Sequence, residues 1–189
     1  MTILVNKSQF LNTYKNKKLG LVSAYKKNNI LPLKSSIELA GIVGDLFSDG
    51  HIGSKMVIFS SNNNQSLDQF GKNAKKIFRI NYEIRDVITN MYGVKSLYIF
   101  DSPLMRILNL CGVPIGNKVL QKYSIPSWIL DKDEFMIEFL RHLFSNDGCV
   151  TGDKRRVKIR IMFHKDESIL DDNYNFLESI RGFLWYSRF

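Results

Sequence analysis

The sequence contains few of the residues that build disulfide frameworks and classical zinc sites. Among 189 residues there are two cysteines, Cys111 and Cys149, and three histidines, His51, His142 and His164. The cysteines have no paired spacing, which favours a reducing compartment and argues against a disulfide framework or a cysteine-based zinc site. The histidines are not at ligand spacing, so a histidine-rich metal site is not expected.

Long apolar runs are also missing. No stretch approaches the roughly 20 apolar residues of a membrane-spanning helix, and residues 1–7 lack the apolar region of a signal peptide. We therefore expect a cytoplasmic or organellar-matrix protein that is not secreted and has no membrane partner. Hydrophobic residues still make up 44% of the chain, which permits a sizeable core and argues against disorder.

The charge of the chain is strongly biased towards positive. There are 27 lysines and arginines against 18 acidic residues, and the formal net charge is +9. A surplus of this size favours a polyanionic partner, nucleic acid ahead of an anionic membrane surface. A basic protein without such a partner is the alternative.

One short pattern occurs twice. Residues 42–50 end in Asp49-Gly50 and residues 140–148 end in Asp147-Gly148. Each copy is typical of the last turns of an apolar helix that stops at Asp-Gly and passes into a strand. The separation of the copies is the length of one small subdomain, which predicts an internal repeat.

The elements around the two copies follow a similar order. The first half predicts a helix from Ser35 or Ser36, strands within 51–61, a helix over 66–79 capped by Ser66, strands at 81–88 and 95–100, and a helix from 102. The second half predicts a helix over 133–147, a strand over 155–164 and a helix over 167–182. We divide the chain into a basic, weakly helical lead-in (1–34), a first subdomain (35–111), a linker (112–131) and a second subdomain (132–189).

Small residues mark one face of the first repeated helix. Ala40, Gly44 and Ser48 lie at i, i+4 and i+8. Glycine inside a helix costs about 1 kcal/mol relative to alanine, so Gly44 is better explained by another element that packs against the backbone. The second repeated helix is the natural candidate for that element.

Two carboxylates at neighbouring helix ends would favour a cation. Each would face the negative end of a helix dipole, and the two would repel each other unless one took a proton or a cation lay between them. Oxygen ligands without histidine or thiolate select Mg²⁺ or a similar ion. Asp-Gly is also a common turn signal, and this simpler explanation remains open for each copy alone.

These residues resemble the LAGLIDADG homing endonucleases. The resemblance rests on Leu39-Ala40-Gly41 with residues 42–50, on residues 139–148, and on residues 112–118 and 125–128, which look like the inter-repeat segment of archaeal and intein-type members. It implies an α+β fold of two pseudo-symmetric αββαββα subdomains that pack through the two motif helices.

The resemblance also implies functional residues. Asp49 and Asp147 would bind Mg²⁺ or Mn²⁺, with the carbonyls of Ser48 and Asn146 as further ligands. Lys165 stands where the family often has a lysine near the cleavage centre, and Ser61-Asn62 hold the matching place in the first half. The sheets would lie in the major groove of double-stranded DNA, and both strands would be cut across the minor groove.

The chain departs from the family pattern in three places. The family's earlier acidic position is Phe47 in the first copy and Ser145 in the second, and it is not the essential ligand. His142 replaces the second-motif glycine that matches Gly44, and we expect a core histidine satisfied by a backbone carbonyl rather than a catalytic one. Matching Ser168 to Ser66 places Phe189 opposite Val87. The second subdomain would therefore stop within its third strand and be C-terminally incomplete.

Basic residues alternate with apolar ones in the second half. Arg156, Lys158 and Arg160 would share one face of a strand, with Val157, Ile159 and Ile161 on the other. Such a face suits phosphate contact and base recognition, although a solvated face is the simpler alternative. Lys55, Arg85 and Lys95 are looser candidates for DNA binding in the first half.

The preferred interpretation is a metal-dependent, site-specific DNA endonuclease that hydrolyses phosphodiester bonds in intron homing. The alternatives are an intron-splicing maturase that binds intron RNA, and a cleavage-inactive DNA-binding relative. A pseudo-symmetric monomer is expected, with a dimer as the alternative because the second half is shortened.

Overall fold

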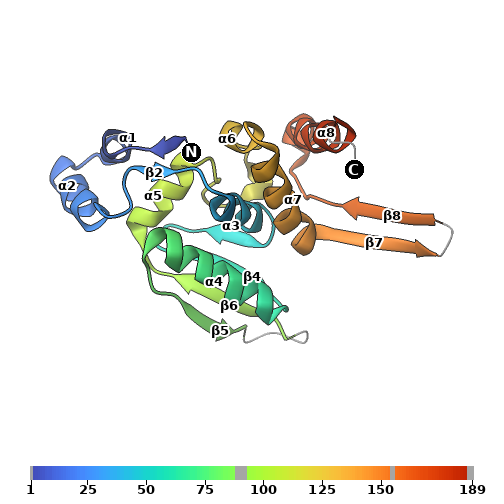
Figure 1. Ribbon diagram of the computed structural model, residues 1–189, viewed down its shortest axis with the longest axis horizontal. Helices are drawn as coiled ribbons and strands as arrows, with labels where there is room; N and C mark the ends of the chain where they lie inside the picture. Colours follow the sequence, from blue (N-terminus) through green and yellow to red (C-terminus); the bar gives the residue numbers. More distant parts are fainter. Residues whose placement is uncertain (1, 88–92, 154–155, 187–189) are drawn as a thin grey trace.

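The computed structural model describes residues 2–87, 93–153 and 156–186 of the chain, and over these residues the fold is of the α+β class (Figure 1). This confirms the expected class. In chain order the elements are β1 (Ile3–Val5), α1 (Lys7–Asn12), α2 (Lys17–Lys26), β2 (Leu33–Lys34), α3 (Ile37–Phe47), β3 (Gly50–Ile52), β4 (Val57–Ser61), α4 (Asn64–Phe78), β5 (Glu83–Asp86), β6 (Lys95–Ile99), α5 (Ser102–Leu110), the 3₁₀ turn η1 (Lys118–Leu120), α6 (Ser127–Leu130), α7 (Asp133–Asp147), β7 (Gly148–Asp153), β8 (Arg156–Ile161), the 3₁₀ turn η2 (Glu167–Ile169) and α8 (Leu170–Tyr186).

Helix α3 begins where the sequence predicts and is almost wholly buried. The Ser36 side chain accepts a hydrogen bond from the Leu39 amide at 3.2 Å, and Glu38 lies in the first turn, so the start of the helix is capped and its dipole is complemented. Residues 39–47 are all buried. A helix that is apolar on every side must be covered on every side, and α3 therefore lies at the centre of the molecule (Figure 1).

An antiparallel sheet and one helix cover α3 in the first half. The strand order is β3-β4-β6-β5, and β4 pairs with β6 from Val57↔Ile99 to Ser61↔Lys95. Helix α4 packs on this sheet through Phe70, which stacks on Phe59 at a centroid distance of 4.8 Å. The connection from α3 into β3 is immediate, because Gly50 begins the strand. The end of α3 is thereby fixed to an edge of the sheet.

In the second half a long ribbon replaces the sheet. Helix α7 passes directly into β7, and β7 pairs with β8 from Gly148↔Ile161 to Asp153↔Arg156. The ribbon extends away from the body of the protein, and α8 lies beside its base (Figure 1). Phe176 of α8 contacts Phe47 of α3 and Phe163 at centroid distances of 6.0 and 5.3 Å. An aromatic cluster therefore anchors α8 to the central helix.

The lead-in is more ordered than the sequence suggests. The two weak helical patterns correspond to α1 and α2, but the strands β1 and β2, which pair antiparallel, are not predicted. The lead-in is attached to α5 by an ion pair between Lys27 and Asp101, and by a hydrogen bond of 2.6 Å from Arg106 to the Thr13 carbonyl. Strands of two or three residues carry too little alternation to be detected in a sequence.

Two other expectations are wrong. Helix α4 is capped by Asn63, which accepts from the Gln65 amide at 2.9 Å, and not by Ser66. In the second half, α8 continues to Tyr186, where the match with the first half predicts the start of a third strand. The predicted end of that strand at Phe189 lies outside the described residues. A continuous helical hydrogen-bond pattern is thus favoured over strand formation at Trp185 and Tyr186.

Candidate functional site

The two motif helices α3 and α7 pack side by side through glycine. A Cβ added to Gly44 would lie 2.5 Å from the Phe139 carbonyl oxygen, and one added to Gly41 would lie 2.6 Å from Nε2 of His142. Real Cβ contacts are essentially never this short. At Gly44 the obstacle is backbone, so only glycine allows this crossing, whereas at Gly41 the obstacle is the ring of His142. The expectation that Gly44 meets the second repeated helix is confirmed, and Gly41, which lies outside the predicted stripe, also faces α7.

The packing brings the two acidic helix ends into one electrostatic environment. Asp49 follows the C-cap Ser48 of α3, and Asp147 is the last residue of α7. Burial raises the pKa of Asp147 to about 6, and the negative charge of Asp49 adds to this rise. Partial removal from water also raises the pKa of Asp49, which Lys118 opposes. The charge of Asp49 thus acts on Asp147, and their joint role as metal ligands remains a prediction.

Lys118 of the linker provides a cation at this site. Its ammonium donates to the carbonyl oxygens of Leu46 and Phe47 at 3.1 and 3.0 Å, and also to that of Ser48. Burial lowers the pKa of Lys118 to about 8, while Asp147 and Asp49 oppose this fall. A positive charge at the negative end of a helix dipole is stabilising. The Ser48 carbonyl, a predicted metal ligand, therefore accepts a hydrogen bond from Lys118.

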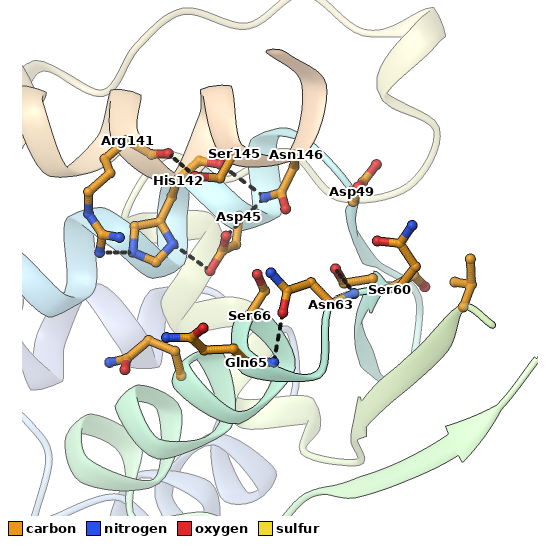
Figure 2. A pocket seen from close by; sticks show the side chains of 14 residues that line it. Asp45, Asp49, Ser60, Asn63, Gln65, Ser66, Arg141, His142, Ser145 and Asn146 are labelled. Atoms are coloured by element: carbon orange, nitrogen blue, oxygen red, sulfur yellow. Dashed lines mark hydrogen bonds and ion pairs between the residues drawn. The ribbon is translucent and has the colours of Figure 1, made fainter. Parts of the chain in front are cut away.

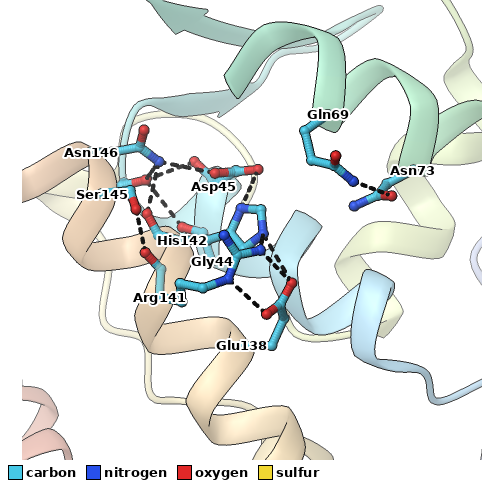
Figure 3. A network of polar contacts seen from close by, with 10 residues as sticks. Gly44, Asp45, Gln69, Asn73, Glu138, Arg141, His142, Ser145 and Asn146 are labelled. Carbon is cyan, nitrogen blue, oxygen red and sulfur yellow. Dashed lines mark hydrogen bonds and ion pairs between the residues drawn. The ribbon is translucent and has the colours of Figure 1, made fainter. Parts of the chain in front are cut away.

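His142 is buried, but it is not satisfied by a backbone carbonyl as expected. Its Nδ1 lies 2.9 Å from Oδ2 of Asp45, and its Nε2 lies 3.2 Å from Oε1 of Glu138 and 2.9 Å from a guanidinium nitrogen of Arg141 (Figure 3). The ring fits at the close crossing because Gly41 leaves room for it. Its partner is Asp45 of α3, across the contact surface between α3 and α7, which we call the seam. The sequence pattern identifies Asp45 only as a position within a helix.

Asn146 adds a second connection between the helices. Its side-chain nitrogen lies 3.0 Å from Oδ1 of Asp45, 2.9 Å from Oγ of Ser48 and 3.0 Å from the His142 carbonyl. Two of these three acceptors, Asp45 and Ser48, belong to the end of α3, and the third belongs to α7 itself (Figure 3). The structure thus shows a role for the Asn146 side chain, while the metal-ligand role of its carbonyl remains a prediction.

A polar cavity of about 800 Å³ opens beside Asp49 (Figure 2). It lies between the seam and the start of α4, and its lining consists largely of hydroxyl and amide side chains. The lining residues are Asp45, Asp49, Ser60, Ser61, Asn62, Asn63, Gln65, Ser66, Gln69, Val94, Arg141, His142, Ser145 and Asn146. Ser61 and Asn62, which the family resemblance matches to Lys165, line the same cavity as Asp49.

Lys165 lies on the other side of the site, against the linker. Its ammonium donates to the carbonyls of Lys118, at 3.1 Å, and of Gln121, and it lies 3.4 Å from the centroid of the Tyr123 ring. Its side chain has no exposed area, and burial lowers its pKa while Asp172 opposes this. Its contacts are with the segment that carries Lys118. The catalytic role of Lys165 remains a prediction.

The predicted DNA-binding residues lie in two separate places. Lys55 is exposed in the β3–β4 turn, Arg85 is exposed on β5 and Lys95 is half-buried on β6. Arg85 forms an ion pair with Glu83 and lies over the Tyr98 ring, 5.3 Å from its centroid. Part of its charge is therefore already compensated within the sheet.

The basic strand of the second half is exposed on both faces. Arg156, Lys158 and Arg160 alternate along β8 and are all exposed. Val157 and Ile159 on the opposite face are 71% and 69% exposed. The predicted alternation is present, but the apolar face of the ribbon does not join the core, because α8 covers only the base of the ribbon.

The sequence interpretation missed Lys118 and Asp45. Lys118 belongs to the linker segment 112–118 that resembles the inter-repeat segment of the family, and this was the signal that could have identified it. Asp45 is 3% exposed, and a lone charged residue within an otherwise apolar run indicates a specific partner. That partner, His142, is almost a hundred residues away in the sequence, so its identity could not be read from the run.

Clusters of metal-ligating side chains and membrane-spanning helices were sought among the described residues. Among these residues, no three histidine, cysteine, aspartate or glutamate side chains form a cluster suited to a metal ion. None of the helices described is long and apolar enough to cross a membrane.

Comparisons with known proteins give partial likenesses. No protein-family model matches the chain. The chain is similar to the replication factor C small subunit of Methanocaldococcus jannaschii, with 32% identity over 120 residues that cover 58% of this chain and 6% of that protein. It is also similar to the tRNA-splicing ligases RtcB of M. jannaschii, at 25% identity over 85% of this chain, and of Pyrococcus furiosus, at 24% identity over 87% of this chain. The chain spans 19% of the length of each ligase, so the likeness concerns one portion of these proteins.

Proposed function

We propose that this protein is a divalent-metal-dependent endonuclease of the homing type that hydrolyses phosphodiester bonds at a specific site in double-stranded DNA. The observation that carries the proposal is the pair of raised pKa values at the ends of the two packed helices: burial, and after it the charge of Asp49, raises the pKa of Asp147 to about 6, and burial raises that of Asp49. Two carboxylates that disfavour their own charge in this way are suited to binding a cation.

The residues of the site fit Mg²⁺ or Mn²⁺. Such ions are commonly held by one or two carboxylates together with water and substrate phosphate, and Asp49 and Asp147 supply two. A bound ion of this kind activates water and stabilises the leaving oxygen in phosphodiester hydrolysis. The Lys118 ammonium, which now contacts carbonyls of α3, would offset negative charge beside the phosphate.

The arrangement of the elements supports the finer form of the fold. Helix α3 with β3, β4 and α4 has the same order as α7 with β7, β8 and α8. We infer two related subdomains, residues 35–111 and 132–189, joined by the linker 112–131 and preceded by the lead-in 1–34. The DNA would contact the basic side chains of β8, of which Lys158 and Arg160 are exposed.

An RNA-binding role is the second candidate. Two of the similar proteins are named tRNA-splicing ligases, and an exposed basic ribbon can bind either nucleic acid. A maturase would use the same surface without needing the two carboxylates. A cleavage-inactive DNA-binding protein would likewise retain the surface alone.

The decisive experiment uses a supercoiled plasmid that carries the uninterrupted host locus, and a transcript of the interrupted one. Wild-type protein is expected to cut both DNA strands in Mg²⁺, while Asp49→Asn and Asp147→Asn lose cleavage and keep DNA affinity. The variant Asp86→Asn, on the exposed strand β5, serves as the control. Tight DNA binding without cleavage in Mg²⁺ or Mn²⁺ would refute the endonuclease, and preferred binding of the transcript with accelerated splicing would favour the maturase.

A further inference from the structure

The seam between α3 and α7 contains a buried carboxylate that packing alone does not require. Asp45 is 3% exposed and lies where residues 39–47 otherwise bury apolar or small side chains. Burying a charge is unfavourable unless it is paired and hydrogen-bonded. Apolar residues of similar volume usually serve a seam equally well or better. A retained charge at this place therefore indicates a geometric role.

The two oxygens of Asp45 bind two different groups of α7. Oδ2 lies 2.9 Å from Nδ1 of His142, and Oδ1 lies 3.0 Å from the side-chain nitrogen of Asn146. The same nitrogen lies 2.9 Å from Oγ of Ser48. These hydrogen bonds have defined directions, so they fix how far one helix can slide or turn against the other. Contacts between glycine and alkyl groups alone have no such direction, so they would restrict sliding of the two helices less.

The far side of the His142 ring is also held. Its Nε2 meets Glu138 and Arg141, and Arg141 donates to Glu138 through two nitrogens at 2.9 and 2.7 Å. Gly41 lies against the ring itself. The imidazole therefore has little freedom, and it transmits the position of α7 to Asp45 (Figure 3).

These bonds lie directly beside the acidic pair. Asp45 is one helical turn before Asp49, and Asn146 immediately precedes Asp147. A shift of register at Asp45 would therefore move the two carboxylates relative to each other. Cation affinity depends steeply on such placement, and loss of an outer partner commonly reduces metal affinity or activity by about 10–100-fold.

We propose that Asp45 is a positioning residue: held between His142 and Asn146, its carboxylate sets the register of α3 against α7 and thereby the separation of Asp49 and Asp147. This inference rests on the proposed function, because it assigns Asp45 a task only if the acidic pair binds a cation. In this role Asp45 acts through the packing of the two helices and is not itself a ligand of the cation.

The test measures Mn²⁺ affinity by electron paramagnetic resonance on the full chain, together with the Mg²⁺ concentration that gives half-maximal plasmid cleavage. Asp45→Asn and Asn146→Ala are expected to raise both concentrations by about tenfold or more. The exchange variant Asp45→Asn with Asn146→Asp restores a hydrogen bond between the two positions with donor and acceptor exchanged. It is expected to recover at least half of the lost Mn²⁺ affinity, measured on a logarithmic scale. Because Asn146→Asp also adds a carboxylate beside Asp147, this single variant is measured too, and the recovery counts only where the exchange variant binds Mn²⁺ more tightly than Asn146→Asp alone.

The matched control is Asp101→Asn. Asp101 is also a poorly exposed carboxylate, paired with Lys27, and it lies at the start of α5, away from the acidic pair. It is expected to lower thermal stability while the Mn²⁺ affinity stays within about twofold. Circular dichroism confirms that each variant is folded. If Asp45→Asn does not fold, Asn146→Ala still tests the proposal, because it removes the contact to Asp45 and leaves the His142–Asp45 pair in place.

The outcomes separate the two proposals. If wild-type protein cleaves DNA but Asp45→Asn and Asn146→Ala need no more Mn²⁺ or Mg²⁺ than wild type, Asp45 is structural only and the positioning role is refuted. If wild-type protein binds Mn²⁺ without cleaving any DNA, the endonuclease fails and the affinity shifts still decide the role of Asp45. If it neither binds Mn²⁺ nor cleaves DNA, both proposals are refuted.

Discussion

The ammonium group of Lys118 lies 3.0 Å from the backbone carbonyl oxygen of Phe47, so that a linker residue caps the helix that leads to Asp49. Its other contacts are the carbonyls of Leu46 and Ser48. The negative end of the α3 dipole, the two carboxylates and this lysine thus form one charged cluster. Its parts come from three regions of the chain, and its properties can be tested group by group.

The first prediction concerns the pH dependence that Lys118 contributes to stability. Its pKa is about 8 in the folded protein and 10.5 for an ordinary lysine, so between these values the unfolded chain holds a proton that the folded chain has lost. Stability therefore rises with pH over this window. Between pH 8 and 10 the free energy of unfolding of wild type should rise by roughly 2 kcal/mol relative to that of Lys118→Met. Urea denaturation at a series of pH values measures it. Parallel pH profiles would contradict this prediction.

The second prediction concerns Asp147. Its pKa is raised to about 6, so between about pH 4 and 6 the folded protein binds more protons than the unfolded chain, and stability falls as pH rises. Asp147→Asn removes this penalty. Because the group is partly exposed and screened, the variant should be about 1 kcal/mol more stable than wild type at pH 7. Below pH 4 Asp147 is neutral in wild type, so this difference in stability should disappear. Asp86→Asn, an exposed carboxylate on β5, should show no such pH-dependent gain.

The third prediction tests the helix crossing. Gly44→Ala places a Cβ 2.5 Å from the Phe139 carbonyl oxygen and 2.9 Å from Cβ of His142. The backbones must separate, and the expected loss of stability is about 2–3 kcal/mol. Gly182→Ala is the matched control, since a Cβ there meets nothing within 4 Å. It should stabilise α8 by up to about 1 kcal/mol. Thermal denaturation distinguishes the pair, and equal effects would argue against the close crossing.

The fourth prediction concerns the basic ribbon. Lys158→Gln and Arg160→Gln should weaken binding to duplex DNA and each reduce the slope of log K against log salt by about 1. Lys75→Gln removes an exposed lysine of α4 that the ribbon does not include. It should leave the slope unchanged. Fluorescence anisotropy at several salt concentrations measures all three variants, and a slope that changes only for Lys75→Gln would place the nucleic acid on α4.

Local signals in the sequence were sufficient for most elements. Ser36 caps α3 as expected because serine before a periodic apolar run is a strong start signal. The cap of α4 was misplaced because Asn63 and Ser66 are both good capping residues, and only the observed hydrogen bond to Gln65 distinguishes them. The expected third strand at Trp185 was wrong because a match between repeats says nothing about where a helix stops.

The sequence by itself determined that one apolar helix ends just before Asp49 and another at Asp147, and that a basic strand lies in the second half. These features are set by local periodicity and by the Asp-Gly ends, which neighbouring residues decide. The tertiary structure alone decided that Lys118 caps α3, that Lys165 contacts the linker, and that His142 pairs with Asp45. Those contacts join residues far apart in the chain, and they form because buried charges and open helix ends require partners that only folding brings near.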